Sequence, residues 1–275
     1  MEFEEIAGRG LVLVGCGKMG SALLEGWLRG GLPPDAVWVV EPNPSDWLRA
    51  RAEEGVHLSA ALPPDPRVVV LAVKPQMMAE ALPQIAQAVG AETLVLSIAA
   101  GTPIAAFEAA FGPGTAIVRA MPNTPAAIGQ GISAIVGNAA AGAEDLTLAE
   151  RLMRAVGDVV RLDDEAQMDA VTAVSGSGPA YVFLLIEALA AAGAAEGLSP
   201  ELALRLARAT VAGAGALAIE ADEGPDQLRR NVTSPGGTTE AALRVLMDEA
   251  EGLGPLVRRA VHAAAERSRE LGKAS

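Results

Sequence analysis

The N-terminal half of the chain alternates short apolar runs with amphipathic stretches. Runs rich in valine, leucine and isoleucine are expected to form strands at 11–14, 37–40, 68–73, 94–98, 116–121, 132–136 and 159–162. Helical patterns lie between them, for example at 46–54, 77–89 and 146–156. Near-continuous apolar runs separated by helices are typical of parallel strands covered on both faces. The pattern predicts an α/β fold with a Rossmann-type doubly wound sheet over residues 1–162.

The pattern changes after residue 162. From residue 163 onward no further β-type run occurs, and helical stretches are expected at 164–174, 179–196, 200–222, 239–251 and 255–271. Pro179, Pro200 and Pro255 stand at first-turn positions, where a residue without an amide hydrogen is tolerated. Residues 163–275 are therefore predicted to form an all-α domain.

The stretch 180–195 is apolar on nearly every face, and Glu187 is its only charge. It is too short and too interrupted for a membrane span. A helix that is apolar all round must be buried on all sides, and about five helices supply little cover alone. We expect an obligate homodimer with interlocked helical domains.

The composition and charge of the chain exclude some classes of binding partner and favour a cellular location. The chain has 275 residues, is 51% hydrophobic and carries a net charge of -13 without a basic run, which argues against nucleic acid or an anionic membrane surface. Cys16 is the single cysteine, so no internal disulfide can form, and its place inside a glycine turn favours a small fitting residue over a nucleophile. The acidic segment MEFEEIAGRG lacks the apolar stretch of a signal peptide, which predicts a cytoplasmic protein.

A glycine-punctuated turn follows the first predicted strand. In LVLVGCGKMG, Gly15, Gly17 and Gly20 stand at the G-x-G-x-x-G spacing, and a helical run over 21–29 follows. The first glycine permits a tight turn, the second lets a pyrophosphate approach, and the third allows the helix to pack closely. The helix N-terminus then holds the phosphates. Such a spacing also occurs in ordinary turns, but this context favours a dinucleotide site.

The residues after the next strands carry further candidates, because ligands of such sheets lie beyond the carboxyl ends of the strands. Lys74 and Pro75 follow the third run, 99–101 follow the fourth, and 122–125 follow the fifth. Loop chemistry alone gives glycine, proline and asparagine at such places. Lys74 is less easily explained in this way, because the chain has only three lysines.

Glu41 follows Gly20 by 21 residues. An acidic side chain at that distance bonds the adenine ribose 2′-hydroxyl of NAD and repels the 2′-phosphate of NADP. The alternative is a solvated carboxylate in the turn EPNP. No arginine stands directly beside Glu41, although Arg49 and Arg51 are near in sequence, so the pattern leans to NADH.

Two segments of the second half carry chemistry, SGSGPAY at 175–181 and NVTSPGGTTE at 231–240. In the latter a Gly-Gly turn exposes backbone N–H groups at a helix N-terminus, and Thr238 and Thr239 add hydroxyl donors. This pattern is typical of an anion site, although an ordinary capped helix has the same composition.

The motifs GCGKMG, AVKPQ, SIAAGT, RAMPNTPA, AVSGSGPAYVF and NVTSPGGTTEAALRVLMD occur in an order that resembles the pyrroline-5-carboxylate reductase family over essentially the whole chain. The resemblance implies reduction of 1-pyrroline-5-carboxylate to L-proline with NADPH or NADH, the final step of proline biosynthesis. It also implies a helical dimerisation domain and assembly into a larger ring such as a decamer.

The same resemblance assigns residues to the site. It implies that the following hold the cofactor: Gly15, Gly17, Lys18, Met19, Gly20, Ala72, Lys74, Pro75 and Ala100. Glu41 joins the predicted cofactor residues through its spacing to the glycine turn and not through the resemblance. Asn231 would help to orient cofactor and substrate between subunits. Substrate contacts would come from Glu165, Asp222, Ser234, Gly237, Thr238 and Thr239. The family position of Asp222 is often Glu, and NADPH-dependent members often carry Ser, Arg or Thr where this chain has Glu41.

Imine reduction needs alignment more than a strong acid, which suits this chain. The amides of Thr238 and Thr239 would take the carboxylate, and the Thr239 hydroxyl would serve as catalytic donor to the ring nitrogen. His57, expected in a turn, and His262, on a polar helix face, lie outside every motif, and no metal-ligand spacing occurs.

Two rival functions stay open at this point. The β-hydroxyacid dehydrogenases use a lysine on a helix in their second half, whereas Lys273 is the only lysine after Lys74. A non-catalytic nucleotide sensor of the same fold would not need the second anion site.

Overall fold

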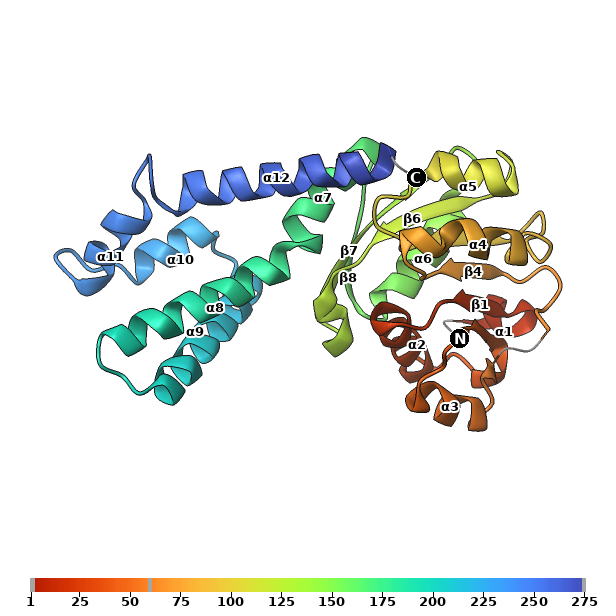
Figure 1. The fold of residues 1–275 in the computed structure, drawn as a ribbon, viewed down its shortest axis with the longest axis horizontal. Coiled ribbons are helices and arrows are strands. Elements are labelled where there is room, and N and C mark those ends of the chain that lie inside the picture. The colour runs from red at the N-terminus through yellow and green to blue at the C-terminus, as the bar shows by residue number, and fades with distance from the viewer. Residues whose placement is uncertain (1–2, 59–60, 274–275) are drawn as a thin grey trace. The chain divides into compact units, whose positions relative to one another are not determined.

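One eight-stranded sheet organises the first part of the molecule. The computed structural model describes residues 3–58 and 61–273 (Figure 1). The strands are β1 (Leu11–Val14), β2 (Val37–Val40), β3 (His57–Leu58), β4 (Val68–Leu71), β5 (Leu94–Ser97), β6 (Ile117–Met121), β7 (Gly131–Gly137) and β8 (Gly157–Arg161). Their order is β3-β2-β1-β4-β5-β6-β7-β8, and every pair is parallel except β6 with β7.

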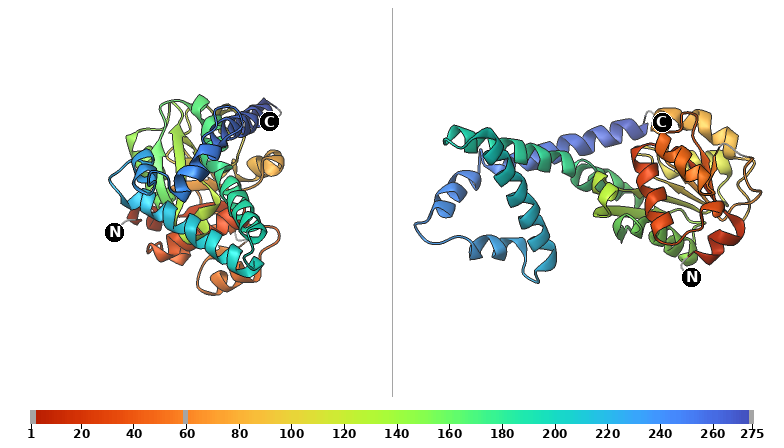
Figure 2. Two further views of the ribbon diagram at one scale, coloured as in Figure 1. Left: turned by 90° about the vertical axis from the view of Figure 1, so that its left-hand side faces the viewer. Right: turned by 90° about the horizontal axis from the view of Figure 1, so that it is seen from below.

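Helices cover both faces of this sheet (Figures 1 and 2). They are α1 (Glu4–Arg9), α2 (Lys18–Arg29), α3 (Asp46–Glu53), α4 (Pro75–Ile85), α5 (Ile104–Phe111) and α6 (Ala143–Arg154), with short 3-10 turns η1 (Pro34–Ala36) and η2 (Thr124–Ile128). Successive strand residues point to opposite faces. Leu13 of β1 therefore joins the core under α1, α2, α3 and α6, while Val12 and Val14 join the core under α4 and α5. Because both faces of the central strands are buried, β1 and β4 are apolar throughout.

The predicted Rossmann-type sheet is confirmed, with two corrections. All strands were expected to be parallel, but β7 is antiparallel to β6. The connection over residues 122–130 is too short for the crossover that parallel neighbours require. His57, expected in a turn, lies in the edge strand β3, where its ring stacks on Trp38 with 4.3 Å between centroids. A strand of two residues is too short to show the alternating pattern of apolar and polar residues by which strands are predicted.

The remaining described chain is helical. The elements are η3 (Glu165–Gln167), α7 (Met168–Val171), the π-helical turn η4 (Thr172–Gly176), α8 (Gly178–Ala195), α9 (Pro200–Glu220), α10 (Pro225–Asn231), α11 (Thr238–Leu246) and α12 (Leu253–Lys273). The sequence pattern anticipates most of these helices. In this region the pattern misses α10, and in the sheet unit it misses α1 and α5. All three helices are short and lack a long apolar period.

The chain divides into two compact units. One comprises residues 1–176 and 265–275, and the other comprises 177–264. The end of α12 belongs to the sheet unit because Ala265 and Ser268 are buried there, and the Ser268 hydroxyl donates to Asp169 Oδ1 at 2.5 Å. The last strand ends at Arg161, and this division falls after residue 176; the domain boundary at residue 163 stays a prediction.

Helices α8 and α9 form an antiparallel pair within the second unit (Figures 1 and 2). Gly197, with φ 97°, makes the turn between them, and Ser199 caps α9 by accepting a hydrogen bond from Leu202 N. A Cβ at Gly193 would lie 3.3 Å from Ala203 Cβ. Small residues thus allow the two helices to pack closely.

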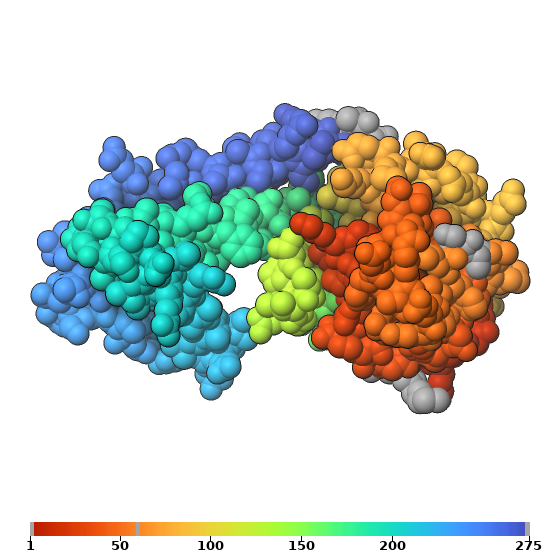
Figure 3. Space-filling view, turned by 60° about the horizontal axis from the view of Figure 1, so that its bottom comes forward, coloured from red at the N-terminus to blue at the C-terminus, as the bar shows by residue number. Residues whose placement is uncertain are grey.

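Many large apolar side chains of this pair are exposed, and the pair lies on the visible face in Figure 3, where it is coloured green to cyan. No residue of α8 is buried in the described chain, and Phe183 and Leu184 are 58% and 64% exposed. By length and composition alone, the stretches 165–195 and 200–220 could each cross a membrane. A helix that is apolar on every face and uncovered by its own chain requires another apolar surface.

Candidate active site

The glycine turn between β1 and α2 has the three geometries that a dinucleotide requires. Gly15 has φ 89°, a left-handed conformation that favours glycine. A Cβ on Gly20 would lie 2.4 Å from the carbonyl oxygen of Gly15, so the third glycine is needed for close packing. A Cβ on Gly17 would have no neighbour within 4 Å. The open space at Gly17 leaves room for a pyrophosphate to approach, as the motif predicts.

The first turn of α2 is available to an anion. Gly17 is the N-cap, no side chain caps the helix, and its first turn holds no acidic residue. The backbone N–H groups of Lys18, Met19 and Gly20 have no partner within an α-helix, because the first N–H groups of a helix never do. Lys18 adds an exposed positive charge. These residues fit a dinucleotide pyrophosphate.

Glu41 follows β2 and is folded against this turn. Its Oε2 accepts a hydrogen bond from Cys16 N at 2.9 Å, and its Oε1 accepts one from Asn43 N at 3.1 Å. Burial, with a smaller contribution from the Glu41 charge, raises the pKa of the Cys16 thiol to about 12. Cys16 is therefore a buried neutral thiol at neutral pH, as expected for a packing residue and unlike a nucleophile.

The other predicted cofactor residues lie at the carboxyl ends of neighbouring strands. Ala72 N donates to Val14 O at 2.8 Å, which continues the pairing of β4 with β1. Lys74 is exposed and is the N-cap of α4, and Pro75 is at the first turn of that helix. Ala100 follows β5, which pairs with β4. Because β1, β4 and β5 are adjacent, these loops lie along one edge of the sheet together with the glycine turn.

Glu165 is held by the sheet unit. Its Oε1 accepts hydrogen bonds from Arg119 Nη1 at 2.7 Å and from Ile104 N, at the start of α5, at 2.9 Å. Arg119 lies in β6 and is only 6% exposed. Both charged residues line a cavity of about 430 Å³ that also contains Asp169 and Arg269. Glu165 therefore neutralises a buried arginine, and its contact with substrate stays a prediction.

Sequence reasoning missed Arg119. The residue interrupts the apolar run AIVRAM, and an arginine inside a buried strand requires a buried acidic partner. This single charge within an apolar run was the one sequence feature that indicated a buried ion pair. The identity of its partner, 46 positions away, depends on the fold.

The second predicted anion site is the start of α11. Gly236 has φ 69°, and Gly237 is the N-cap without a side-chain cap. Gly237 N donates to Ser234 O at 3.0 Å, which closes the turn. The turn leaves the first-turn amides of Thr238 and Thr239 without helical partners. Two N–H donors and two hydroxyl groups at a helix N-terminus suit a carboxylate.

Asn231 ends α10 and has a partner that the sequence did not indicate. Its Nδ2 donates to the Glu223 carboxylate at 3.2 Å, and its Oδ1 accepts from Gln227 Nε2 at 2.7 Å. Asp222, the neighbour of Glu223, is exposed. The carboxylate that contacts Asn231 is thus one position beyond the acidic residue expected near the substrate.

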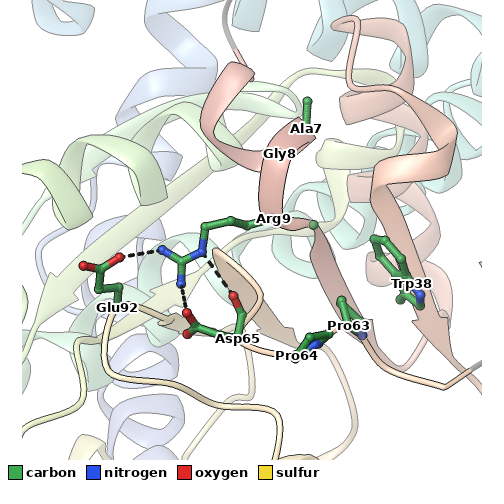
Figure 4. A pocket seen from close by; sticks show the side chains of 9 residues that line it. Ala7, Gly8, Arg9, Trp38, Pro63, Pro64, Asp65 and Glu92 are labelled. Atoms are coloured by element: carbon green, nitrogen blue, oxygen red, sulfur yellow. Dashed lines mark hydrogen bonds and ion pairs between the residues drawn. The ribbon is translucent and has the colours of Figure 1, made fainter.

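Another cavity lies at the opposite, amino-terminal edge of the sheet (Figure 4). Arg9 extends there between Asp65 Oδ2 and Glu92 Oε2, each 2.9 Å from its guanidinium, and Trp38 stands nearby. These charges are already paired, and ligands of doubly wound sheets bind at the other edge. Across residues 3–58 and 61–273, no cluster of three or more His, Cys, Asp or Glu could hold a metal ion.

Comparisons with known proteins agree with this organisation. Residues 10–101 match the family model "NADP oxidoreductase coenzyme F420-dependent", and residues 165–271 match "Pyrroline-5-carboxylate reductase dimerisation". The pyrroline-5-carboxylate reductase of Pseudomonas aeruginosa is 43% identical over 266 residues, covering 96% of this chain and 97% of that protein.

Solved structures show the same similarity. A pyrroline-5-carboxylate reductase from Coxiella burnetii has a TM-score of 0.88 and 36% identity, covering 96% of this chain and 98% of that one. Pyrroline carboxylate reductase from Plasmodium falciparum, with NADP bound, has a TM-score of 0.82 and 30% identity, covering 97% and 99%.

The Rossmann-type sheet and its open glycine turn place this protein among the dinucleotide-dependent oxidoreductases. The helical region that follows matches a dimerisation domain. The chain belongs to the pyrroline-5-carboxylate reductase family.

Proposed function

We propose that the chain reduces 1-pyrroline-5-carboxylate to L-proline with NAD(P)H, the last step of proline biosynthesis. Family membership supports the reaction. One observation carries the proposal: the chain has a second helix terminus suited to an anion, at Thr238 and Thr239, besides the dinucleotide turn. A reductase acting on a carboxylate-bearing imine needs both sites, whereas a dinucleotide sensor needs only the first.

The binding roles follow from the free donors. The backbone amides of Thr238 and Thr239 take the substrate carboxylate, and Ser234 and Gly237 shape the turn that presents them. Asn231, with Glu223 behind its amide, takes part in orienting the ligands. Asp222 and Glu165 complete the proposed set of substrate residues.

The reduction balances without a strong acid. A bound reduced nicotinamide supplies a hydride to the imine carbon. The C=N π bond becomes the lone pair of the ring nitrogen, which holds or gains a proton and is a secondary amine in proline. The Thr239 hydroxyl donates a hydrogen bond to that nitrogen and fixes the ring orientation. Alignment of this kind lowers the activation free energy by several kcal/mol, and by roughly 7–11 kcal/mol in ideal systems.

The active assembly is proposed to be a homodimer. Support comes from the dimerisation-family match over residues 165–271 and from the uncovered apolar surface of α8. We extend the proposal to a larger ring such as a decamer, on the family resemblance. A cytoplasmic location is proposed because the reaction depends on nicotinamide and a single cysteine cannot form an internal disulfide.

Tracing the hydride tests the reaction. The protein is incubated with 1-pyrroline-5-carboxylate and reduced nicotinamide cofactor deuterated at C4, separately on each face, and the product is analysed by mass spectrometry. We expect L-proline with deuterium on its C5 carbon from one of the two labelled cofactors. Cofactor binding without labelled proline would contradict the proposal and favour a sensor.

A further inference from the structure

We propose that Glu41 makes this chain selective for NADH over NADPH. The inference rests on the proposed function, because it concerns the dinucleotide that the reductase uses. Glu41 directly follows β2, at the sheet edge where Rossmann-type proteins place the adenine ribose. The P. falciparum relative was solved with NADP bound, so the preference of this chain depends on its own residues.

The Glu41 carboxylate is fixed in place. Its two oxygens accept hydrogen bonds from Cys16 N at 2.9 Å and Asn43 N at 3.1 Å, which attach it both to the glycine turn and to its own loop. Each carboxylate oxygen can accept a further hydrogen bond, so a ribose hydroxyl can still be bound. The side chain cannot move away from a 2′-phosphate without losing both backbone hydrogen bonds.

The neighbouring cavity suits an uncharged adenosine. Its volume is about 420 Å³, and its described lining residues are Val40, Glu41, Pro42, Ala61, Leu62, Gln84 and Ile85. Within that described lining, Glu41 is the only charged side chain. A 2′-phosphate requires arginine or lysine donors, whereas adenine and a ribose diol require apolar surface and hydrogen-bond acceptors.

The arginines that follow in α3 have other partners. Arg49 Nε lies 4.0 Å from Asp46 Oδ1, and Arg51 Nη2 lies 2.8 Å from Glu54 Oε1. In the described part of the chain neither forms an ion pair with Glu41. A 2′-phosphate would therefore meet a carboxylate that no arginine neutralises.

Direct binding measurements on the full-length protein without imine test the inference. Dissociation constants for NADH and NADPH are measured by calorimetry at constant ionic strength. We expect NADH to bind at least about tenfold more tightly, because a carboxylate faces the 2′-phosphate. Glu41→Gln removes the charge at nearly constant volume, and Glu41→Ser also removes the bulk. Both variants should bring the ratio of the two constants close to one, chiefly by strengthening NADPH binding.

Glu53→Gln is the matched control, because it removes one charge from an exposed side chain of α3 that is not the partner of Arg49 or Arg51, and it should leave the ratio unchanged. Equal or tighter binding of NADPH by the unmodified chain would overturn the inference and leave the reductase assignment intact. So would an unchanged ratio in both Glu41 variants. Binding of neither dinucleotide would overturn both proposals.

Discussion

At the scale of single residues, the most specific chemical role is the one that we propose for Thr239. Its hydroxyl is the proposed donor to the substrate nitrogen, while its backbone amide takes part in holding the carboxylate. Thr239→Ala removes only the hydroxyl, so we expect kcat to fall about tenfold with little change in KM, in proportion to one hydrogen bond of roughly 1.4 kcal/mol. Steady-state kinetics measure both constants.

Thr239→Ser retains a hydroxyl and is the conservative partner of that variant. It should recover most of the lost turnover, which a loss of packing alone would not explain. Kinetics of Thr239→Ala equal to those of the unmodified enzyme would exclude the proposed role.

The ion pair between Arg119 and Glu165 should stabilise the sheet unit, in addition to the substrate contact proposed for Glu165. Arg119 is buried, while the Glu165 side chain is 30% exposed. Arg119→Met leaves the carboxylate without its cation, so we expect the free energy of unfolding to fall by about 2–3 kcal/mol, below the full range for buried pairs because Glu165 is partly solvated. Urea denaturation measures this difference.

Combining Arg119→Met with Glu165→Gln removes the unpaired charge as well. The double variant should be more stable than Arg119→Met alone. If Arg119→Met were as stable as the unmodified chain, the ion pair would make no contribution to the free energy of unfolding.

At the scale of elements, the glycines of the β1–α2 turn are predicted to serve different purposes, Gly20 for the packing of the fold and Gly17 for cofactor binding. A Cβ at Gly20 would collide with backbone, whereas one at Gly17 would point into open space. We therefore expect Gly20→Ala to lower the Tm, because α2 must move away from the turn. Gly17→Ala should keep the Tm while weakening dinucleotide binding about tenfold or more, because the methyl group occupies the pyrophosphate approach.

Thermal unfolding and calorimetric titration distinguish the two variants. Each serves as the control for the other, since both add one methyl group within a few residues. Unimpaired cofactor binding by Gly17→Ala would place the pyrophosphate elsewhere.

Elements with a long apolar period were predictable, and those without one were not. The strands at 11–14 and 37–40 agree with β1 and β2, because burial on both faces requires apolar residues throughout. The orientation of β7 was not predictable from its own residues, because it depends on the length of the preceding connection. Helix α5 was missed because its eight residues, IAAFEAAF, are apolar with little periodicity.

The site shows the same limit. The glycine turn and the Gly-Gly turn could be recognised because local backbone geometry requires those residues. The partner of Glu165 could not, because Arg119 lies in a strand 46 positions away and the contact depends on tertiary packing. The partners of Asn231 are local, four and eight positions earlier, but no motif singled them out. A binding site built within one turn can therefore be predicted from the sequence, whereas a side-chain contact between distant elements cannot.

At the scale of the whole molecule, assembly should depend on α8. Its exposed apolar residues need a partner surface, and a second copy of the helical domain supplies one. We expect light scattering to show a particle of at least twice the 27.9 kDa chain mass, with a Tm that rises with protein concentration. Leu184→Glu should dissociate the particle, because it places a charge in the interface.

Ile128→Glu is the matched control, since Ile128 is a similarly exposed apolar residue in the sheet unit. It should leave the mass unchanged. A monomeric unmodified chain, or one whose Tm does not depend on concentration, would contradict the proposed dimer.

The central claim is that this chain is a pyrroline-5-carboxylate reductase, and its most direct test is absorbance at the dihydronicotinamide band. Purified protein is mixed with NADH or NADPH, with and without 1-pyrroline-5-carboxylate. We expect rapid oxidation only when the imine is present, and faster oxidation of NADH at low cofactor concentration. No imine-dependent oxidation with either cofactor, in protein that binds one of them, would contradict the claim.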